Sequence, residues 1–462
     1  SACPVHGRGP RMATLLVTLL ATESTHSAFH TVEHPSTTPA AADAPNIIFI
    51  VSDDLGYNDV SFHGGFGSIP TPNIDALANG GVILERYYVQ PVCSPSRATF
   101  ATGRHVIHTG VYDPMNGGSG DLSKNFSLWS DGFKAAGYTV HNVGKWHLGM
   151  SSWQFTPLER GFESYYGYLG GGETYWTHQE GSALAFWDDY EPALNSSCSS
   201  NADSCPVEYY SADVFTAQAQ GVIEAASMQS KPLFLYLAYQ SVHSPDEAPQ
   251  ALIDRFNSTM GFAPRRTFGG MVTALDLGIG EVVKTLKETK MYDKTFIVFT
   301  TDNGGPADGF NSNWACNWPL RGMKRTLFEG GLRGVGLVHG AGLMQHAIGT
   351  TAAEFVHATD WFHTLLRLAI QGVAKSAAGT GRAKDYATQV RALFPSNEPK
   401  FELGDGMDVW DYLSGAMSES PRLEMIHEAH PQTAEGKTDG NGEALRVGDL
   451  KIVIRSGGQV RT

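Results

Sequence analysis

Four runs of apolar residues predict buried β-strands, and each run leads into polar or charged residues. Because the apolar positions are nearly continuous rather than alternating, both faces of the resulting sheet are expected to be covered. The four runs cover residues 46–52, 138–143, 233–238 and 295–301. The residues that follow them are Asp53-Asp54, Lys145-Trp146-His147, His243 and Asp302-Asn303.

Helical periodicity lies between these strands. The spacing of apolar positions predicts helices over residues 73–79, 128–136, 271–288 and 361–370. Strands that alternate with helices indicate an α/β sandwich. Ligands in such folds bind at the carboxyl ends of the strands, so the polar residues that follow the strands are expected to meet there.

The acidic residues after two of the strands suggest a metal site. Asp53, Asp54, Asp302 and Asn303 offer only oxygen ligands, the set that calcium and magnesium prefer. Two adjacent acids at a buried strand end would repel each other without a cation. The alternative is that both pairs simply end strands and begin turns. No Cys/His spacing typical of zinc is present in the sequence.

A cysteine precedes a predicted helix. The helix is expected to start at Pro95, with Ser94 as its N-cap and Gly103 just beyond its end. Cys93 would then lie near the positive end of the helix, where tetrahedral anions bind. The alternative is a buried structural cysteine, which is the usual fate of a free thiol.

Two motifs in this region carry a family resemblance. Cys93-Ser94-Pro95-Ser96-Arg97 followed by Thr102-Gly103-Arg104 resembles the C-x-P-S-R-x-x-x-x-T-G-R signature of type I sulfatases. Residues 137–149 resemble the second signature of that family, and the resemblance extends from about residue 46 to about residue 413. It implies an alkaline-phosphatase-like α/β sandwich. The expected large central sheet is mixed, mostly parallel and flanked by helices, with a small C-terminal β subdomain.

Three further stretches are similar to one branch of the family. Residues 53–60, 235–243 and 317–331 resemble arylsulfatase B, the N-acetylgalactosamine-4-sulfatase, and its I and J relatives. The resemblance implies hydrolysis of sulfate esters, and removal of the 4-sulfate from N-acetylgalactosamine residues of sulfated glycans. Two alternatives are kept: a phosphodiester or phosphonate hydrolase of the same superfamily, and a non-catalytic secreted glycan-binding relative with unmodified Cys93.

The resemblance also implies a cofactor and a modified residue. Cys93 would be oxidised to formylglycine by the formylglycine-generating enzyme, and its hydrate would attack the sulfur of a sulfated carbohydrate or aryl sulfate. One calcium ion would be bound by Asp53, Asp54, Asp302 and Asn303 together with residue 93. Metal coordination would lower the pKa of the attacking hydroxyl group.

Five more residues receive roles from the resemblance. Arg97 would stabilise the hydrate and the metal site. Lys145 and Lys324 would bind the sulfate oxygens and offset developing charge. His147 would act as a base, and His243 would contact the sulfate and protonate the leaving oxygen.

The overall charge limits the partners. The chain has 33 Lys and Arg against 47 Asp and Glu, a formal net charge of −14. Such a chain is a poor general binder of nucleic acid. An anionic substrate is still compatible, because Arg97, Lys145, Lys324 and calcium would form one focused cationic pocket.

The organisation of the chain suggests a secreted or lysosomal protein. Residues 1–43 are expected to form a leader with a signal peptide, residues 44–420 the catalytic domain, and residues 421–462 the truncated start of a C-terminal subdomain. Cys198 and Cys205 either form a small disulfide or remain free thiols. Sequons at Asn125, Asn195 and Asn257 favour a glycoprotein, and no apolar run predicts a transmembrane helix. Substrate specificity is expected to depend on the loops 113–125, 173–210 and 306–318.

Overall fold

The structure is a computed structural model. It describes residues 44–64, 69–115, 120–193, 210–309, 311–372, 388–391, 393–394, 404–428, 442–455 and 459–461. The predicted leader, the Cys198–Cys205 pair and the Asn195 sequon lie outside these residues. In the described part of the chain, no helix is long and apolar enough to cross a bilayer.

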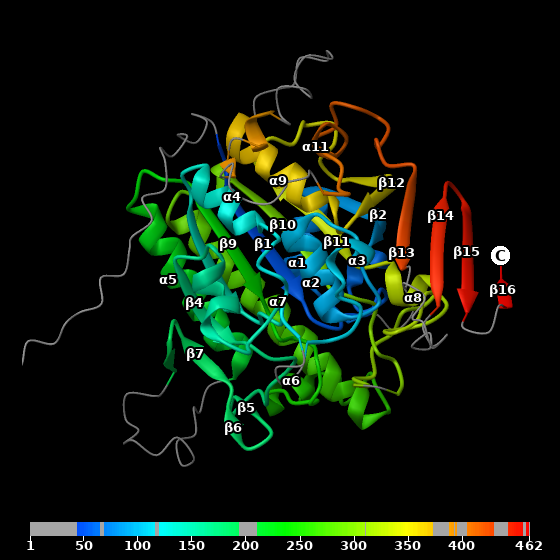
Figure 1. Cartoon of the computed structure of the whole chain (residues 1–462). Coiled ribbons are helices and arrows are strands. Elements are labelled where there is room, and N and C mark those ends of the chain that lie inside the picture. The colour runs from blue at the N-terminus through cyan, green and yellow to red at the C-terminus, as the bar shows by residue number, and fades with distance from the viewer. Residues whose placement is uncertain are drawn as a thin grey trace, which may run out of the picture. The chain divides into compact units, whose positions relative to one another are not determined.

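A ten-stranded sheet forms the centre of the described residues (Figure 1). The four strands predicted from the sequence are neighbours in it, in the order β10-β1-β9-β3, and they are all parallel. Strands β11 and β7 run antiparallel to their neighbours on both sides and make the sheet mixed, as expected. The strands, in sheet order, are β12 (Thr350–His357), β2 (Gly81–Tyr88), β11 (Gly336–Gly340), β10 (Thr295–Thr301), β1 (Asn46–Ser52), β9 (Leu233–Ala238), β3 (Thr139–Gly144), β4 (Ser164–Tyr168), β7 (Phe186–Asp188) and β8 (Glu191–Pro192).

Helices cover both faces of this sheet. Alternate side chains of β1 enter two different cores: Phe49 packs with residues of α2, α4 and α9, whereas Ile48 and Ile50 pack with residues of α1, α5 and α7. Continuous burial on both faces explains why the strand sequences are apolar throughout. The α-helices are α1 (Pro72–Asn79), α2 (Cys93–Thr102), α3 (Val106–Thr109), α4 (Trp129–Ala135), α5 (Ser211–Ser227), α6 (Gln250–Ile253), α7 (Ala263–Glu288), α8 (Glu329–Leu332), α9 (Asp360–Gln371) and α11 (Trp410–Leu413).

The predicted helices are confirmed, with longer bounds for α7 and α9. Short 3₁₀ turns also connect the elements. They are η1 (Ser61–His63), η2 (Trp153–Phe155), η3 (Pro157–Arg160), η5 (Asp254–Phe256) and η6 (Tyr292–Lys294). A two-stranded ribbon, β5 (Gln179–Glu180) with β6 (Ala183–Leu184), lies outside the main sheet.

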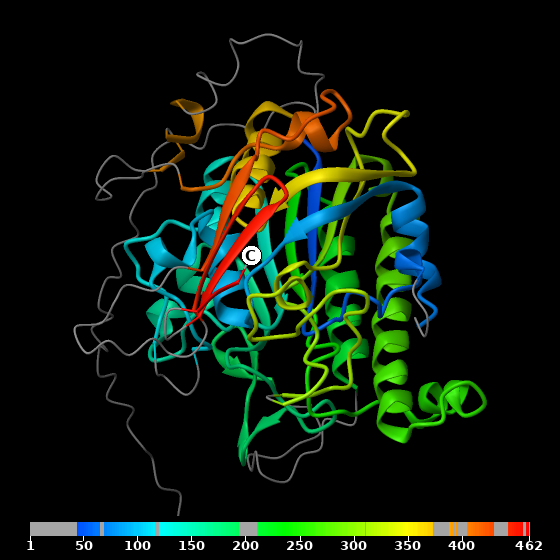
Figure 2. The same ribbon diagram turned by 90° about the vertical axis from the view of Figure 1, so that its right-hand side faces the viewer.

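A second, smaller sheet lies beside the β2 and β12 edge of the large one (Figures 1 and 2). It is antiparallel and contains β13 (Glu424–Glu428), β14 (Glu443–Val447), β15 (Leu450–Arg455) and β16 (Gln459–Arg461). Strands β14 and β15 form a hairpin in it. A small apolar cluster joins the two sheets, because Met425, Ala444 and Val453 pack with Tyr88 and Phe355.

One local prediction was wrong. Helix α2 begins at Cys93 rather than Pro95, and its N-cap is Val92 rather than Ser94. Ser94 is unavailable as a cap because its hydroxyl group donates to the His147 carbonyl oxygen at 2.9 Å and accepts from the Met115 N–H at 3.0 Å. Pro95 is tolerated within the first turn because the first N–H groups of a helix have no intrahelical partner.

Candidate active site

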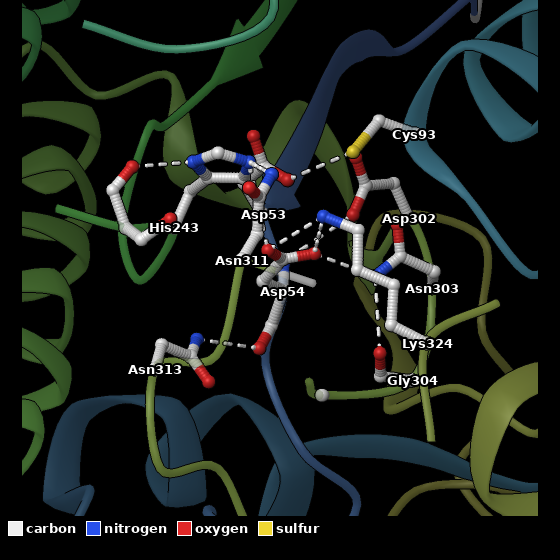
Figure 3. A network of polar contacts seen from close by, with 12 residues as sticks. Asp53, Asp54, Cys93, His243, Asp302, Asn303, Gly304, Asn311, Asn313 and Lys324 are labelled. Carbon is white, nitrogen blue, oxygen red and sulfur yellow. Dashed lines mark hydrogen bonds and ion pairs between the residues drawn. The ribbon is translucent and has the colours of Figure 1, made fainter. Parts of the chain in front are cut away.

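The acidic residues that follow β1 and β10 meet at one edge of the sheet (Figure 3). These strands are paired in register, with Ser52 opposite Thr301, so Asp53 and Asp302 leave the sheet side by side. The N–H of Asp54 donates to Asp302 Oδ1 at 3.3 Å, and Asn303 Nδ2 donates to Asp54 Oδ1 at 2.7 Å. Asp54 is held with a positive φ of 65°, a conformation rare outside glycine that is found at functional sites.

The arrangement fits a hard divalent cation. One ligand atom from each of Asp53, Asp54, Cys93 and Asp302 lies within 4.8 Å of the others, and all four residues are buried. Calcium binds oxygen at 2.3–2.6 Å, so opposite ligands of one ion are about 5 Å apart. Asn303 Oδ1 is also buried and accepts no hydrogen bond from any described residue. The oxygen donors and this buried acceptor therefore suit calcium.

Cys93 lies at the first turn of α2, against the carboxylates. Its Sγ is 3.5 Å from Asp53 Oδ1. Burial raises the pKa of the thiol, and Asp53 raises it further, although Lys145 and Lys324 oppose the shift. A thiol held in its neutral form next to a carboxylate is a poor nucleophile. The unmodified side chain is therefore unsuited to nucleophilic attack in this place.

Arg97 occupies the next turn of the same helix and is fully buried. Its Nε and Nη2 both donate to Asp302 Oδ2, at 3.0 and 2.9 Å, and Nη2 is 3.5 Å from Asp53 Oδ2. Nη1 donates to the carbonyl oxygen of Lys145 at 3.2 Å. A planar guanidinium suits these simultaneous contacts. Arg97 thus fixes α2 against the ends of β10, β1 and β3.

Two lysines complete the charge balance. Lys145 Nζ is 2.5 Å from Asp53 Oδ2, and Lys324 Nζ is 2.7 Å from Asp54 Oδ2. Burial opposes the charged form of Lys324, but Asp54 and other neighbours outweigh it and raise the pKa of the ammonium group. For Asp53, burial raises the carboxyl pKa, but Lys145, His243 and Arg97 outweigh it, so the pKa is lowered.

Gly144 allows Lys145 to reach the site from the end of β3. The residue has φ +100°, and a Cβ atom there would lie 1.9 Å from the carbonyl oxygen of Ala238 on β9. Only glycine permits both the backbone conformation and this close approach. The Lys145 N–H then donates to the same Ala238 oxygen at 2.8 Å.

The two predicted histidines lie at the same edge of the sheet. His243 Nε2 is 3.6 Å from Asp54 Oδ2, and its Nδ1 is 2.6 Å from the Ser244 carbonyl oxygen. Because a carbonyl only accepts, Nδ1 carries a proton. His147 has φ 59°, and burial followed by Lys145 and Arg97 lowers its pKa well below the usual range. Burial also lowers the pKa of His243, although the nearby carboxylates of Asp53 and Asp54 act in the opposite direction and raise it.

Sequence reasoning missed two asparagines that organise this site. Asn311 Nδ2 is 3.1 Å from His243 Nε2, and Asn313 Nδ2 donates to the carbonyl oxygens of Asp54 at 3.2 Å and Val242 at 2.7 Å. Figure 3 shows both side chains directed at the loops that carry His243 and Asp54. No spacing in the sequence marks them. Their only signal is membership of the loop 306–318, which was expected to influence specificity.

Comparisons with known proteins identify sequences similar to this chain. A family model described as Sulfatase matches residues 45–372. Arylsulfatase J of Mus musculus is 36% identical over 409 residues, covering 88% of this chain and 61% of its own length. N-acetylgalactosamine-6-sulfatase of Sus scrofa is 30% identical over 345 residues, covering 71% of this chain and 63% of its own length. This chain therefore spans about three fifths of these relatives.

A solved structure supports the fold assignment. The crystal structure of Ps i-CgsB in complex with k-i-k-neocarrahexaose has a TM-score of 0.70 and 29% sequence identity, covering 89% of this chain and 84% of that one. The predicted mixed α/β sandwich is confirmed. The predicted assignment to the 4-sulfatase branch stays a prediction, because the relatives include both arylsulfatase J and a 6-sulfatase.

Proposed function

This chain belongs to the sulfatase family, and we propose that it hydrolyses sulfate esters at the Asp53–Cys93–Asp302 edge of its sheet. The observation that carries the proposal is the set of four ligand atoms within 4.8 Å, one of them the sulfur of a cysteine in a sulfatase-type motif. A phosphodiester hydrolase remains the competitor to be tested, because it would use the same group of residues.

The charges of the site suit a monoanionic ester. Three carboxylates are paired with three buried cations: Asp302 with Arg97, Asp53 with Lys145, and Asp54 with Lys324. These formal charges sum to zero. A bound calcium ion would supply two positive charges and Lewis acidity, and formylglycine at position 93 would supply the nucleophile that the buried thiol cannot. An anion would then be attracted in spite of the net charge of −14 on the chain.

The chain's own residues then bind the anion and move protons. Lys145 and Lys324 reach the cluster from different loops and contact different carboxylates, so their ammonium groups can hold two different oxygens of a tetrahedral ester. His243 is held by the Ser244 carbonyl oxygen and Asn311, which direct its Nε2 toward Asp54 and the cluster. We propose that this nitrogen, which is unprotonated in the neutral ring, passes a proton to the leaving oxygen once it has gained one, and that His147, which its surroundings keep neutral, accepts a proton.

The substrate is proposed to be a sulfated carbohydrate, with the 4-sulfate of N-acetylgalactosamine as the first compound to test. Support comes from the resemblance of residues 53–60, 235–243 and 317–331 to that branch. A secretory route, to the lysosome or the outside of the cell, is proposed with it. The exposed sequons at Asn125 and Asn257 would be accessible to glycosylation.

The test combines peptide mass and sulfate release. Protein from cells that contain the formylglycine-generating enzyme should show a residue-93 peptide lighter than the cysteine form, and should release sulfate from an aryl sulfate. Cys93→Ala should abolish release with an unchanged circular dichroism spectrum. Cys316→Ala removes the other free cysteine of the described residues and is the matched control, expected to retain activity.

Two outcomes would contradict the proposal. Faster turnover of a phosphodiester than of the sulfate ester would assign the site to the competing hydrolase. An unmodified Cys93 with no turnover of either ester, in protein that binds a sulfated sugar, would favour the non-catalytic alternative.

A further inference from the structure

A cavity of 650 Å³ lies at the N-terminal end of α7. Its apolar lining includes Phe256, Met260 and Phe262, and two arginines, Arg255 and Arg265, also line it. The volume is in the range of pockets that bind small ligands. No residue with a proposed catalytic role lines this cavity, so the ester cleavage does not account for it.

Two exposed aromatic residues pack against each other at this cavity. Phe262 is 51% exposed and lines the cavity, and Trp314 is 39% exposed. Their rings meet edge to face, with centroids 4.9 Å apart and planes at 77°. We call this pair the Phe262–Trp314 ledge. Exposed aromatic rings beside a cavity are typical of binding surfaces.

The ledge is held in place rather than being a mobile surface feature. Trp314 has a φ of 67°, which is strained for a bulky residue. Arg265 Nη1 donates to the Trp314 carbonyl oxygen at 2.8 Å, while Arg265 Nη2 contacts Asp59 Oδ1 at 2.6 Å. The Trp314 side chain also lies close to the carboxylate of Asp246. Arg265, itself fixed by Asp59, therefore holds the Trp314 backbone, and Phe262 packs against the indole ring.

Trp314 lies in a loop that also contacts the proposed active site. The preceding residue, Asn313, bonds the backbone of Asp54, and Asn311 contacts His243. Asp246 lies three positions after His243 in the sequence. Since consecutive Cα atoms are 3.8 Å apart, the Cα atoms of Trp314 and Asn311 are at most about 11 Å apart. A ligand that extends beyond the cleaved ester by one or two sugar rings could reach the ledge.

We infer that the Phe262–Trp314 ledge and the adjoining cavity bind the sugar residues that continue from the sulfated one, so that the enzyme prefers a sulfated oligosaccharide to a short ester. The inference rests on the proposed function. The apolar face of a pyranose ring packs well on an aromatic ring. Arg255, at the cavity wall, suits a second anionic group such as a sulfate or a uronate. Trp314 lies three residues after Asn311, which contacts His243, and this nearness to the ester site favours a glycan chain over a protein partner.

The experiment compares two substrates in one matured enzyme. The kcat/KM for a chondroitin 4-sulfate hexasaccharide is divided by the kcat/KM for an aryl sulfate. Phe262→Ala and Trp314→Ala should each lower this ratio about tenfold, mainly through the KM of the hexasaccharide. Trp153→Ala is the matched control, because Trp153 is also exposed, at 44%, and makes edge-to-face contacts with Trp187 and Tyr190. Its ratio should stay within twofold of the wild type.

The outcomes separate this inference from the proposed function. An unchanged ratio in both ledge variants, with aryl sulfate turnover present, would overturn the inference and leave the function standing. Absence of turnover of both substrates by the wild type would refute the function itself. A ratio raised by Asn257→Gln would instead assign the cavity to a glycan on that sequon. If Phe262→Ala changes the oligomeric mass while the ratio of the two substrates stays constant, the cavity would be assigned to contact between copies of the chain. Either of these two results overturns the inference.

Discussion

Glu329→Gln should loosen the small C-terminal sheet from the catalytic sheet. The Glu329 carboxylate receives three hydrogen bonds from three strands: from Tyr88 of β2 at 2.8 Å, Arg446 of β14 at 2.8 Å and Lys451 of β15 at 2.9 Å. Glu329 also begins α8, five residues after Lys324. The neutral amide keeps the size of the side chain but loses its charge.

The magnitude follows from the shifted acidity of the carboxyl group. Burial raises the pKa of Glu329, but Lys451 and Arg446 outweigh it and lower the value from 4.5 to about 2. A shift of that size corresponds to about 3 kcal/mol in favour of the folded, charged form. Burial also lowers the pKa of Lys451, so desolvation of the ammonium group offsets part of the gain. We therefore expect Glu329→Gln to lower the free energy of local opening of the C-terminal sheet by about 1–3 kcal/mol.

The pH dependence has a definite sign. Because the folded pKa is depressed, the contribution of Glu329 is complete above pH 4.5 and is lost as the pH falls toward 2. Hydrogen exchange of the β14 and β15 amides, corrected for intrinsic rates, gives the free energy of local opening for each variant. The difference between wild type and Glu329→Gln should be largest at neutral pH and shrink through this window.

A control and a refuting result complete the design. Glu281→Gln removes an exposed ion pair to Lys284 on α7 and should change stability by less than about 0.5 kcal/mol. Equal opening free energies for wild type and Glu329→Gln at neutral pH would refute the reasoning. So would a difference between them that stays constant from pH 4.5 to pH 2.

Three further predictions concern the site and its support. Asp302→Asn should weaken calcium binding, measured by titration calorimetry, and should lower sulfate release at least about 100-fold. Chelation of calcium from the wild type should lower sulfate release to a similar extent. Unchanged calcium binding would remove Asp302 from the ligand set. Asp302→Ala should in addition lower the free energy of unfolding in urea by about 3–5 kcal/mol, since it leaves the Arg97 guanidinium buried without the carboxylate that accepts its two hydrogen bonds. Equal stability of Asp302→Asn and Asp302→Ala would contradict this. Gly144→Ala should lower the free energy of unfolding, measured in urea, by at least about 3 kcal/mol, because the added Cβ atom would lie 1.9 Å from the Ala238 carbonyl oxygen. Gly221→Ala, in helix α5 with open space around it, is the control and should stabilise by about 0.5–1 kcal/mol.

Much of the fold could be predicted because its signals are local. The strands β1, β9 and β10 begin and end where the apolar runs do, and α1, α4 and α9 follow the helical spacing closely. Burial on both faces requires continuous apolar residues, so the sequence carries this information within each segment. The motif around Cys93 was equally visible, since its residues lie within one helix and the turn that follows it.

The meeting of the site residues was decided by long-range pairing. Asp54 and Lys324 are 270 positions apart, and their contact depends on the register of β1 against β10 and on the path of the loop after β10. Asn313 and the Phe262–Trp314 ledge carry no periodic or spacing signal, because loop residues are placed by the elements around them. The start of α2 was mispredicted for the same reason: the Ser94 hydroxyl that could cap the helix bonds instead to His147 and Met115, which only the folded chain brings near it.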